Sequence, residues 1–219
     1  MKIFLDTANL KDIQAGVDLG VVDGVTTNPT YIAKEGRPIQ DQIRAICGII
    51  DGDISAEVVS TTAREMVEEG KSLARIHRNV VVKIPLIPEG IKATKALSSE
   101  GIRVNVTLCF TPVQAMLAAK AGAYIISPFV GRLDDIALHG MELVQDIVRV
   151  YQNYGFSTQV LAASIRGPLH VLEAARAGSH IATMPFKVLE SLFHHPLTDK
   201  GLATFLSDYR KVFQEASVG

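Results

Sequence analysis

Short apolar runs recur along the chain and are separated by longer segments in which apolar residues follow a helical spacing. The short runs are rich in valine and isoleucine, which is typical of strands buried on both faces. Strands are predicted at residues 2–6, 24–27, 54–59, 80–85, 103–108, 124–129, 157–164 and 180–184. Because strands and helices alternate, the pattern predicts parallel βαβ units and an α/β fold. Eight units in 219 residues favour a (β/α)8 TIM barrel; a doubly wound open sheet is less favoured, because the chain lacks a dinucleotide fingerprint or Walker loop.

Polar side chains occur near the carboxyl ends of most of these predicted strands. Successive strand residues point to opposite faces, and in a barrel one face fills the interior. On this parity Lys83 shares the face of Val81, and Ser164 is expected on the face of Ala162. Catalytic residues of barrel enzymes lie at the carboxyl ends of the strands, so we expect the active site there. The polar residues concerned are Asp6, Asn28, Glu57, Lys83, Asn105, Thr107, Ser127 and Ser164.

The chain is predicted to form one domain, residues 1–219, because no linker or low-complexity segment interrupts the alternation. Residues 198–219 follow the eighth unit, and we expect them to form a C-terminal helical arm. Apolar residues recur along this segment at a helical spacing, which predicts packing either on its own barrel or on a neighbouring subunit. They are Leu202, Phe205, Leu206, Tyr209 and Phe213.

Composition excludes several classes of protein. Lys and Arg number 22 against 23 Asp and Glu, so there is no basic footprint for nucleic acid. No apolar run is long enough to cross a bilayer, and we predict neither a membrane nor a nucleic-acid partner. Cys47 and Cys109 both lie in apolar segments, which fits a reducing cytoplasm. The six histidines lack a metal-ligand spacing, so we predict no metal and no cofactor.

Lys83 lies within the apolar run of residues 80–85. A lysine is seldom fully buried without a partner or a purpose. Desolvation disfavours the charged form, and a free amine can attack a carbonyl to form a Schiff base. The alternative is a structural ion pair with Glu57, one strand away. Lys187, which follows the last predicted strand, is the rival amine, and we expect it to be solvated.

Asp6 is the candidate acid or base, because forming a Schiff base and cleaving a carbon–carbon bond both move protons. It ends the first predicted strand, on the face of Phe4. The alternative is that Asp6 caps a helix beginning near Leu10. We favour the acid–base role because of its parity and its position at the strand end.

An anion site is predicted after the sixth and seventh strands. Arg132 follows the sixth strand, and Ser164 and Arg166 end the seventh. Two guanidinium groups and a hydroxyl at one end of the barrel would bind a phosphate through charge-assisted hydrogen bonds. The alternative is that each arginine pairs with a nearby acid such as Asp134 or Asp135.

Taken together, five motifs resemble the transaldolase family, in its short single-domain form that also includes fructose-6-phosphate aldolases. The resemblance extends almost from end to end, and the motifs are specific only in combination. They are residues 4–8 (FLDTA), 24–29 (GVTTNP), 82–85 (VKIP), 105–108 (NVTL) and 127–132 (SPFVGR).

The resemblance implies a (β/α)8 barrel that transfers a dihydroxyacetone unit between ketose and aldose phosphates in the non-oxidative pentose phosphate pathway. Lys83 matches the family's nucleophile and Asp6 its acid–base residue. Glu57 and Thr107 match a pair that positions a water for proton transfer. The resemblance further implies a set that binds sugar hydroxyls and phosphate: Asn28, Asn105, Ser127, Phe129, Arg132, Ser164 and Arg166.

The family resemblance also implies partners and a close competitor. The partners are sugar phosphates and further copies of the chain, since short forms often build decamers of two pentameric rings. The aldolase branch, which releases free dihydroxyacetone, typically has glutamine at the position of Glu57 and tyrosine at that of Phe129. This chain has glutamate and phenylalanine at these positions and therefore follows the pattern of the transaldolases. Two hypotheses of a different class stay open: a sugar-phosphate-binding protein without turnover, and a metal-dependent aldolase.

Overall fold

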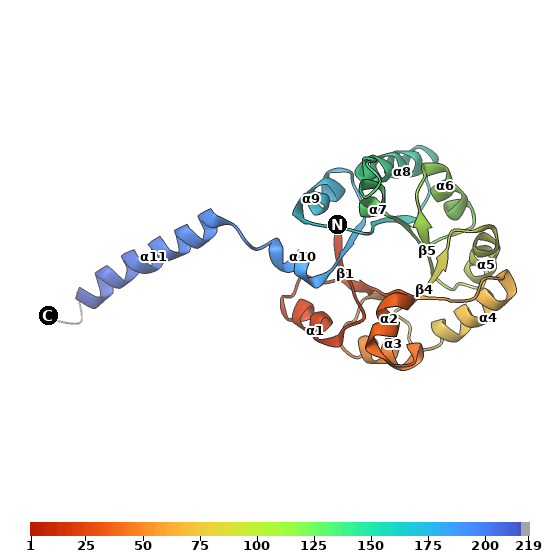
Figure 1. Cartoon of the computed structure of the whole chain (residues 1–219), viewed down its shortest axis with the longest axis horizontal. Coiled ribbons are helices and arrows are strands. Elements are labelled where there is room, and N and C mark those ends of the chain that lie inside the picture. The colour runs from red at the N-terminus through yellow and green to blue at the C-terminus, as the bar shows by residue number, and fades with distance from the viewer. Residues whose placement is uncertain (216–219) are drawn as a thin grey trace.

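A computed structural model describes residues 1–215 of the chain, with side chains up to residue 211. Eight parallel strands in this part of the chain close into one barrel, in sequence order around the ring (Figure 1). The predicted (β/α)8 barrel with an additional C-terminal helix is confirmed. The strands are β1 (Lys2–Asp6), β2 (Gly24–Thr26), β3 (Asp53–Glu57), β4 (Val80–Pro85), β5 (Val104–Cys109), β6 (Ile125–Pro128), β7 (Gln159–Ala162) and β8 (Ile181–Met184).

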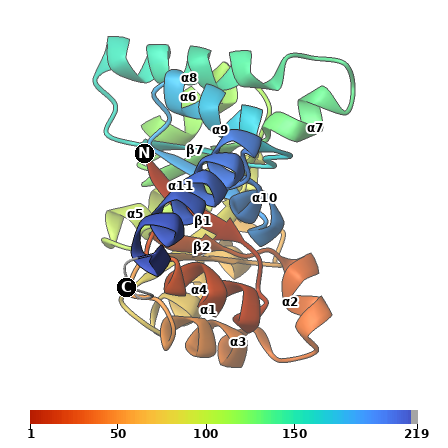
Figure 2. The same ribbon diagram turned by 90° about the vertical axis from the view of Figure 1, so that its left-hand side faces the viewer.

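Helices surround the strands, and each crossover from one strand to the next contains at least one of them (Figure 2). Local signals fix their ends. At α6, for example, Thr111 and Gln114 satisfy each other's backbone N–H groups in a capping box, and Pro112 takes the first helical position. The helices are α1 (Leu10–Asp18), α2 (Pro29–Glu35), α3 (Ile39–Cys47), α4 (Ala63–Ala74), α5 (Pro88–Ser99), α6 (Pro112–Lys120), α7 (Val130–Asp134), α8 (Gly140–Tyr154), α9 (Pro168–Arg176), α10 (Phe186–Ser191) and α11 (Pro196–Glu215).

Apolar side chains of alternating parity fill the barrel. The barrel interior contains Phe4, Val81, Ile125, Leu161 and Ile181, all without exposed surface. The intervening strand residues pack against the helices in a second, larger cluster. This division is the physical reason why a polar residue on the inward face of a strand end points into the barrel opening.

The predicted face of Ser164 is wrong. Strand β7 ends at Ala162, which packs outward against the helices, whereas Leu161 and Ala163 face the interior. Ser164 lies beyond the strand and has a positive φ of 60°. The backbone turn at Ser164, and not strand parity, therefore directs this residue.

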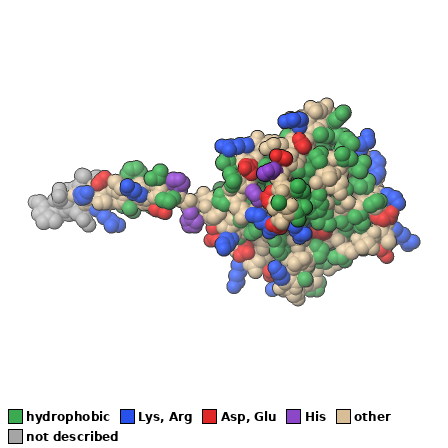
Figure 3. Space-filling view, turned by 45° about the horizontal axis from the view of Figure 1, so that its top comes forward, with side chains coloured by type: hydrophobic (Ala, Val, Ile, Leu, Met, Phe, Trp, Pro, Cys, Tyr) green, Lys and Arg blue, Asp and Glu red, His purple; other side chains and the backbone are tan. Residues whose placement is uncertain are grey.

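The last helix, α11, stands away from the barrel (Figure 1). As far as side chains are described, its large apolar residues are exposed, including Phe205 at 74%, and they alternate with charged groups along the arm (Figure 3). The helical arm is thus found, and it does not pack on its own barrel. The side chain of Phe213 and residues 216–219 lie outside the described part. Within residues 1–215, no helix combines the length and the hydropathy that a membrane crossing requires.

Candidate active site

Lys83 lies on the inward face of β4, near the strand's carboxyl end, and only 4% of its surface is exposed. Its Nζ lies 2.9 Å from Glu57 Oε2 and donates a hydrogen bond of 2.8 Å to the carbonyl oxygen of Thr27. Glu57 and Lys83 are direct neighbours across β3 and β4. The predicted ion pair therefore exists. It accounts for the burial of the lysine and also places a proton acceptor beside the amine.

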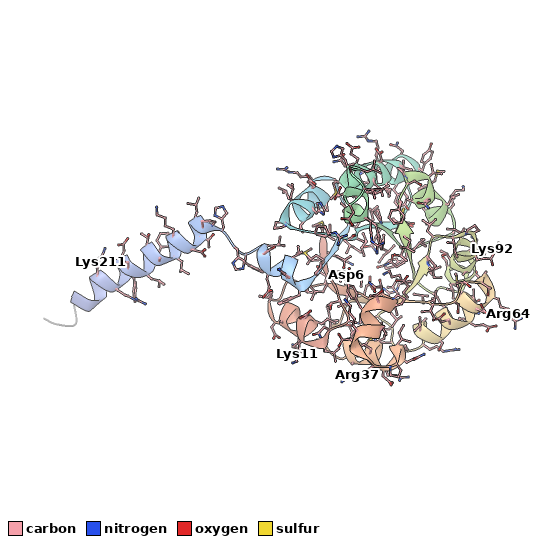
Figure 4. The ribbon with its side chains drawn as sticks, in the orientation of Figure 1. Asp6, Lys11, Arg37, Arg64, Lys92 and Lys211 are labelled. Carbon is pink, nitrogen blue, oxygen red and sulfur yellow. The ribbon has the colours of Figure 1, made fainter. Side chains whose placement is uncertain are left out.

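Asp6 ends β1 and lies on the inner side of the ring of helices, whereas Lys11, Arg37, Arg64 and Lys92 lie at the periphery (Figure 4). Burial raises the pKa of the Asp6 carboxyl, and the positive charge of Lys83 only partly offsets this effect. A capping role for Asp6 is excluded, because the side chain of Asn9 caps α1. Asp6 is thus a largely buried carboxyl that holds its proton more strongly than usual.

A chain of hydroxyl groups reaches Asp6 from two neighbouring strands. Thr26 Oγ1 donates to Asp6 Oδ1 at 2.8 Å and lies 2.6 Å from Thr183 Oγ1. Since the single proton of Thr26 goes to Asp6, Thr183 must donate to Thr26. Tyr31 Oη lies 3.4 Å from Asp6 Oδ2, and burial raises the pKa of Tyr31 to about 12.

A second polar chain crosses the barrel beside Lys83. Asn105 is the strand neighbour of Lys83; it donates to Ser55 Oγ at 3.0 Å and accepts from Ser127 Oγ at 2.7 Å. Thr107, two residues further along β5, has a buried hydroxyl without a hydrogen-bond partner in the described chain. A buried hydroxyl in this state is suited to a water or a ligand.

Asn28 performs a structural task and faces the site as well. Its Oδ1 accepts the backbone N–H of Tyr31 at 2.9 Å and so caps α2. Asn28 also lines the cavity at this end of the barrel. Because its oxygen caps the helix, its amide nitrogen is the group left to donate to a ligand. The helix cap therefore fixes the direction of a binding group.

Most of these side chains surround one cavity at the carboxyl end of the barrel, whose volume is about 660 Å³ when the open solvent at its mouth is included. Of the predicted residues, only Glu57, Asn105 and Thr107 do not line it, although Glu57 and Asn105 contact residues that do. Three polar lining residues were not predicted: Thr26, Tyr31 and Thr183. The parity of β2 and β8 could have identified the two threonines, whereas Tyr31 lies on a helix.

The two predicted arginines lie at the rim of the cavity. Arg166 pairs with Asp135 at 2.8 Å, as the sequence had suggested, but more than half of each side chain is exposed. Such pairs are weak in water and can exchange for a phosphate. Arg132 has no acidic partner within the described part, and its guanidinium lies 5.9 Å from the centre of the Phe129 ring.

The remaining sequence candidates do not contribute to this cavity. Lys187 is exposed on α10, as expected. Among the described residues, no group of histidine, cysteine, aspartate or glutamate side chains has the arrangement of a metal site. The site therefore consists of a buried amine, partly buried carboxyls, hydroxyls and two arginines.

Fold and site together define a (β/α)8 barrel protein whose cavity contains the buried amine of Lys83 beside a carboxylate and has two arginines at its rim. The sequence matches the family described as Transaldolase/Fructose-6-phosphate aldolase over residues 3–217. The chain belongs to this family. As a member it is an enzyme of the transaldolase type.

Proteins named "Probable transaldolase" are similar over almost their full lengths. That of Desulfatibacillum aliphaticivorans is 62% identical over 211 residues, which cover 96% of this chain and 99% of that protein. That of Moorella thermoacetica is 61% identical over 212 residues, covering 97% and 99%. That of Clostridium perfringens is 55% identical over 215 residues, covering 98% and 100%.

Proposed function

We propose that the protein is a transaldolase that transfers a dihydroxyacetone unit between sugar phosphates through an imine on Lys83. Sedoheptulose 7-phosphate and glyceraldehyde 3-phosphate would interconvert with erythrose 4-phosphate and fructose 6-phosphate, as in the non-oxidative pentose phosphate pathway. The observation that carries the proposal is the buried amine of Lys83, 2.9 Å from a carboxylate and in one cavity with Asp6.

The first step requires the amine of Lys83 to lose its proton. The base that can take it is Glu57, whose carboxylate lies 2.9 Å from the amine. The amine then adds to the C2 carbonyl of the ketose phosphate, and the carbinolamine loses water to form the iminium. Glu57 returns the proton to the departing hydroxyl, through a water that the buried hydroxyl of Thr107 is available to hold.

The second step breaks the bond between C3 and C4. The Asp6 carboxylate takes the proton of the C4 hydroxyl, the aldose phosphate leaves, and the bonding electrons pass into the iminium to give an enamine. The raised pKa of Asp6 helps it to retain this proton. Asn28 and Ser127 line the cavity and would hold the sugar hydroxyls. Asn105, the third predicted member of this set, does not line it and would orient the Ser127 hydroxyl through their hydrogen bond of 2.7 Å.

The third step transfers the three-carbon unit. The enamine carbon attacks the aldehyde of a second aldose phosphate, and Asp6 gives its proton to the oxygen that becomes the new C4 hydroxyl. Water then hydrolyses the iminium and frees Lys83. Arg132, Ser164 and Arg166 would bind the phosphate at the rim, where bidentate arginine contacts fix the substrate's register.

The alternative function is a fructose-6-phosphate aldolase, in which the enamine gains a proton and dihydroxyacetone is released. Phe129 lines the cavity and carries no hydroxyl to assist that protonation. Glu57 is an acid, not the amide typical of the aldolase branch. Both residues support the transferase. A binding protein without turnover would not need the proton-transfer groups around Lys83.

Product analysis separates these functions. The protein is given fructose 6-phosphate with or without erythrose 4-phosphate, and products are followed by mass spectrometry. We expect sedoheptulose 7-phosphate only when the acceptor is present, and little free dihydroxyacetone without it. Dihydroxyacetone from the donor alone would support the aldolase, and no product in either tube would contradict both enzymatic proposals.

We also propose that the protein is a homo-oligomer, with a decamer of two rings as the expected form, in which α11 packs on another copy of the chain. The exposed leucine and phenylalanine side chains of this arm support a protein partner, since an isolated helix leaves them in water. A reducing compartment such as the cytoplasm fits the two free cysteines, Cys47 and Cys109.

A further inference from the structure

Two separate segments must be aligned if Arg132 and Arg166 are to bind one phosphate. Arg132 belongs to α7, and Arg166 lies in the loop between β7 and α9. Both side chains are long and exposed, so each loses side-chain entropy when it is fixed. The structure must therefore hold the backbones of these segments together, and the contacts between them show how.

The start of α7 rests directly on the β7–α9 loop. The backbone N–H of Val130 donates to the oxygen of Ala163 at 3.0 Å, and that of Gly131 donates to the oxygen of Ser164 at 3.1 Å. A Cβ atom at Gly131 would lie 2.2 Å from the Ser164 oxygen and 2.6 Å from Arg166 Nε. Glycine is therefore required for this approach, which brings the Arg166 side chain against α7.

His170 forms the second connection, and it uses both ring nitrogens. Its Nδ1 accepts the backbone N–H of Arg166 at 3.2 Å, and its Nε2 lies 3.0 Å from Asp134 Oδ2. A nitrogen that accepts a hydrogen bond carries no proton, so the proton lies on Nε2 and is donated to Asp134. The other carboxylate oxygen of Asp134 accepts the backbone N–H of Gly140 at 2.9 Å.

This connection joins both arginine-bearing segments. On one side His170 holds the backbone of Arg166 itself. On the other it holds Asp134, two residues after Arg132 and the last residue of α7. The guanidinium of Arg166 is held separately by exposed Asp135. We infer that His170, in its neutral form protonated on Nε2, is a positioning residue that aligns Arg132 and Arg166 for a substrate phosphate.

The inference rests on the proposed phosphate site but not on turnover. Inorganic phosphate is therefore the first probe, measured by its stabilisation of the folded protein in a thermal titration. We expect His170→Ala to weaken phosphate binding about tenfold, which corresponds to ~1.4 kcal/mol. His77→Ala is the matched control, because His77 Nδ1 also accepts a backbone N–H, at 3.2 Å, but precedes β4 at the opposite end of the barrel.

Two conservative variants separate positioning from general support of the fold. His170→Asn places an acceptor near Nδ1 and can keep the contact to Arg166, whereas His170→Gln places a donor near Nε2 and can keep the contact to Asp134. We expect the Asn variant to recover phosphate binding more fully. Recovery by the Gln variant alone, or wild-type binding in folded His170→Ala, would overturn the inference.

Kinetics give the second readout and separate this inference from the proposed function. We expect the His170→Ala variant to raise KM for erythrose 4-phosphate about tenfold, with kcat little changed. Its kcat/KM for unphosphorylated erythrose should match that of the wild type. An equal loss with both acceptors would contradict positioning of a phosphate site. If the wild type transfers nothing, the proposed function fails while the phosphate titration still tests His170.

Discussion

Asp6 is expected to lower the stability of the fold at neutral pH while it serves as the acid–base residue of the reaction. Two hydroxyl groups contact its largely buried carboxyl, whose pKa is raised because the loss of solvent outweighs the attraction of Lys83. A group of this kind favours folding while it is protonated. That contribution is complete below the ordinary value of 3.8 and is lost as the pH rises through the raised pKa, so Asp6 makes the fold less stable at higher pH.

Replacing Asp6 by Asn should therefore lower activity and raise stability at once. We expect kcat to fall about 10²- to 10⁴-fold, the usual contribution of a general acid or base. The midpoint temperature of thermal unfolding at neutral pH should rise by roughly 2–4 °C for each kcal/mol gained in the free energy of unfolding. The gain should vanish as the pH falls below the ordinary value of 3.8. Exposed Asp18→Asn serves as the control, and a neutral-pH loss of stability in Asp6→Asn would contradict this account.

Sequence alone could predict residues whose direction follows from strand parity. Asp6, Glu57, Lys83, Asn105 and Ser127 obey that rule because their strands continue through them or end beside them. The sequence prediction assumed one polar group at each strand end and therefore omitted Thr26 and Thr183. Strand parity also places these two threonines on the inward face. Strand parity could not place Ser164, because its direction depends on a backbone turn with positive φ.

Contacts between loops were also beyond the sequence. His170 lies on α9 and Asp134 on α7, and nothing in their spacing indicates a pair. Tyr31 reaches Asp6 from α2, a helix that Asn28 caps at the edge of the cavity. Local patterns thus predict elements and faces, whereas closure of the barrel decides which loops meet.

At the scale of elements, the two ends of the strands have different roles, one in the cavity and one in stability. The carboxyl ends carry the cavity, and the amino ends carry a polar network that contributes to stability. Asp53, at the start of β3, pairs with Arg103 and accepts a hydrogen bond of 3.1 Å from the hydroxyl of Tyr124. The Arg103 guanidinium also lies 5.3 Å from the centre of the Tyr124 ring. This network connects the starts of three strands.

An Asp53→Asn substitution should separate stability from activity. It leaves the Arg103 guanidinium without its carboxylate, and we expect a loss of about 1–3 kcal/mol in the free energy of unfolding, measured with urea. Activity should stay near that of the wild type, because the cavity lies at the other end. In Glu68→Gln, the exposed pair with Arg64 is removed instead, and stability should change little. A large fall in kcat for folded Asp53→Asn would contradict this division.

At the scale of the whole molecule, the exposed arm is the feature that a single copy leaves unexplained. Leu202, Phe205 and Leu206 form one side of α11 and are largely in water. Burying them against another copy would remove this apolar surface from solvent. Part of the protein's stability is therefore expected to come from its assembly.

Charging that side of the arm should dissociate the assembly. We expect Phe205→Asp to shift the sedimentation of the protein from an oligomer toward a single copy, because a buried carboxylate is costly. Thr204→Asp adds the same charge on the opposite side of the helix and should leave the oligomer intact. A wild-type protein that sediments as one copy, or an unchanged oligomer in Phe205→Asp, would contradict the proposed assembly.

Borohydride reduction tests most directly whether Lys83 carries the substrate, on which the proposed mechanism depends. An imine formed from fructose 6-phosphate would be reduced to a stable amine, and peptide mass spectrometry would locate the added group. We expect the adduct on Lys83, and no inactivation by borohydride in the absence of a carbonyl substrate. Lys83→Met should form no adduct and transfer no dihydroxyacetone unit. An adduct on exposed Lys187 alone, or full activity in Lys83→Met, would contradict the mechanism.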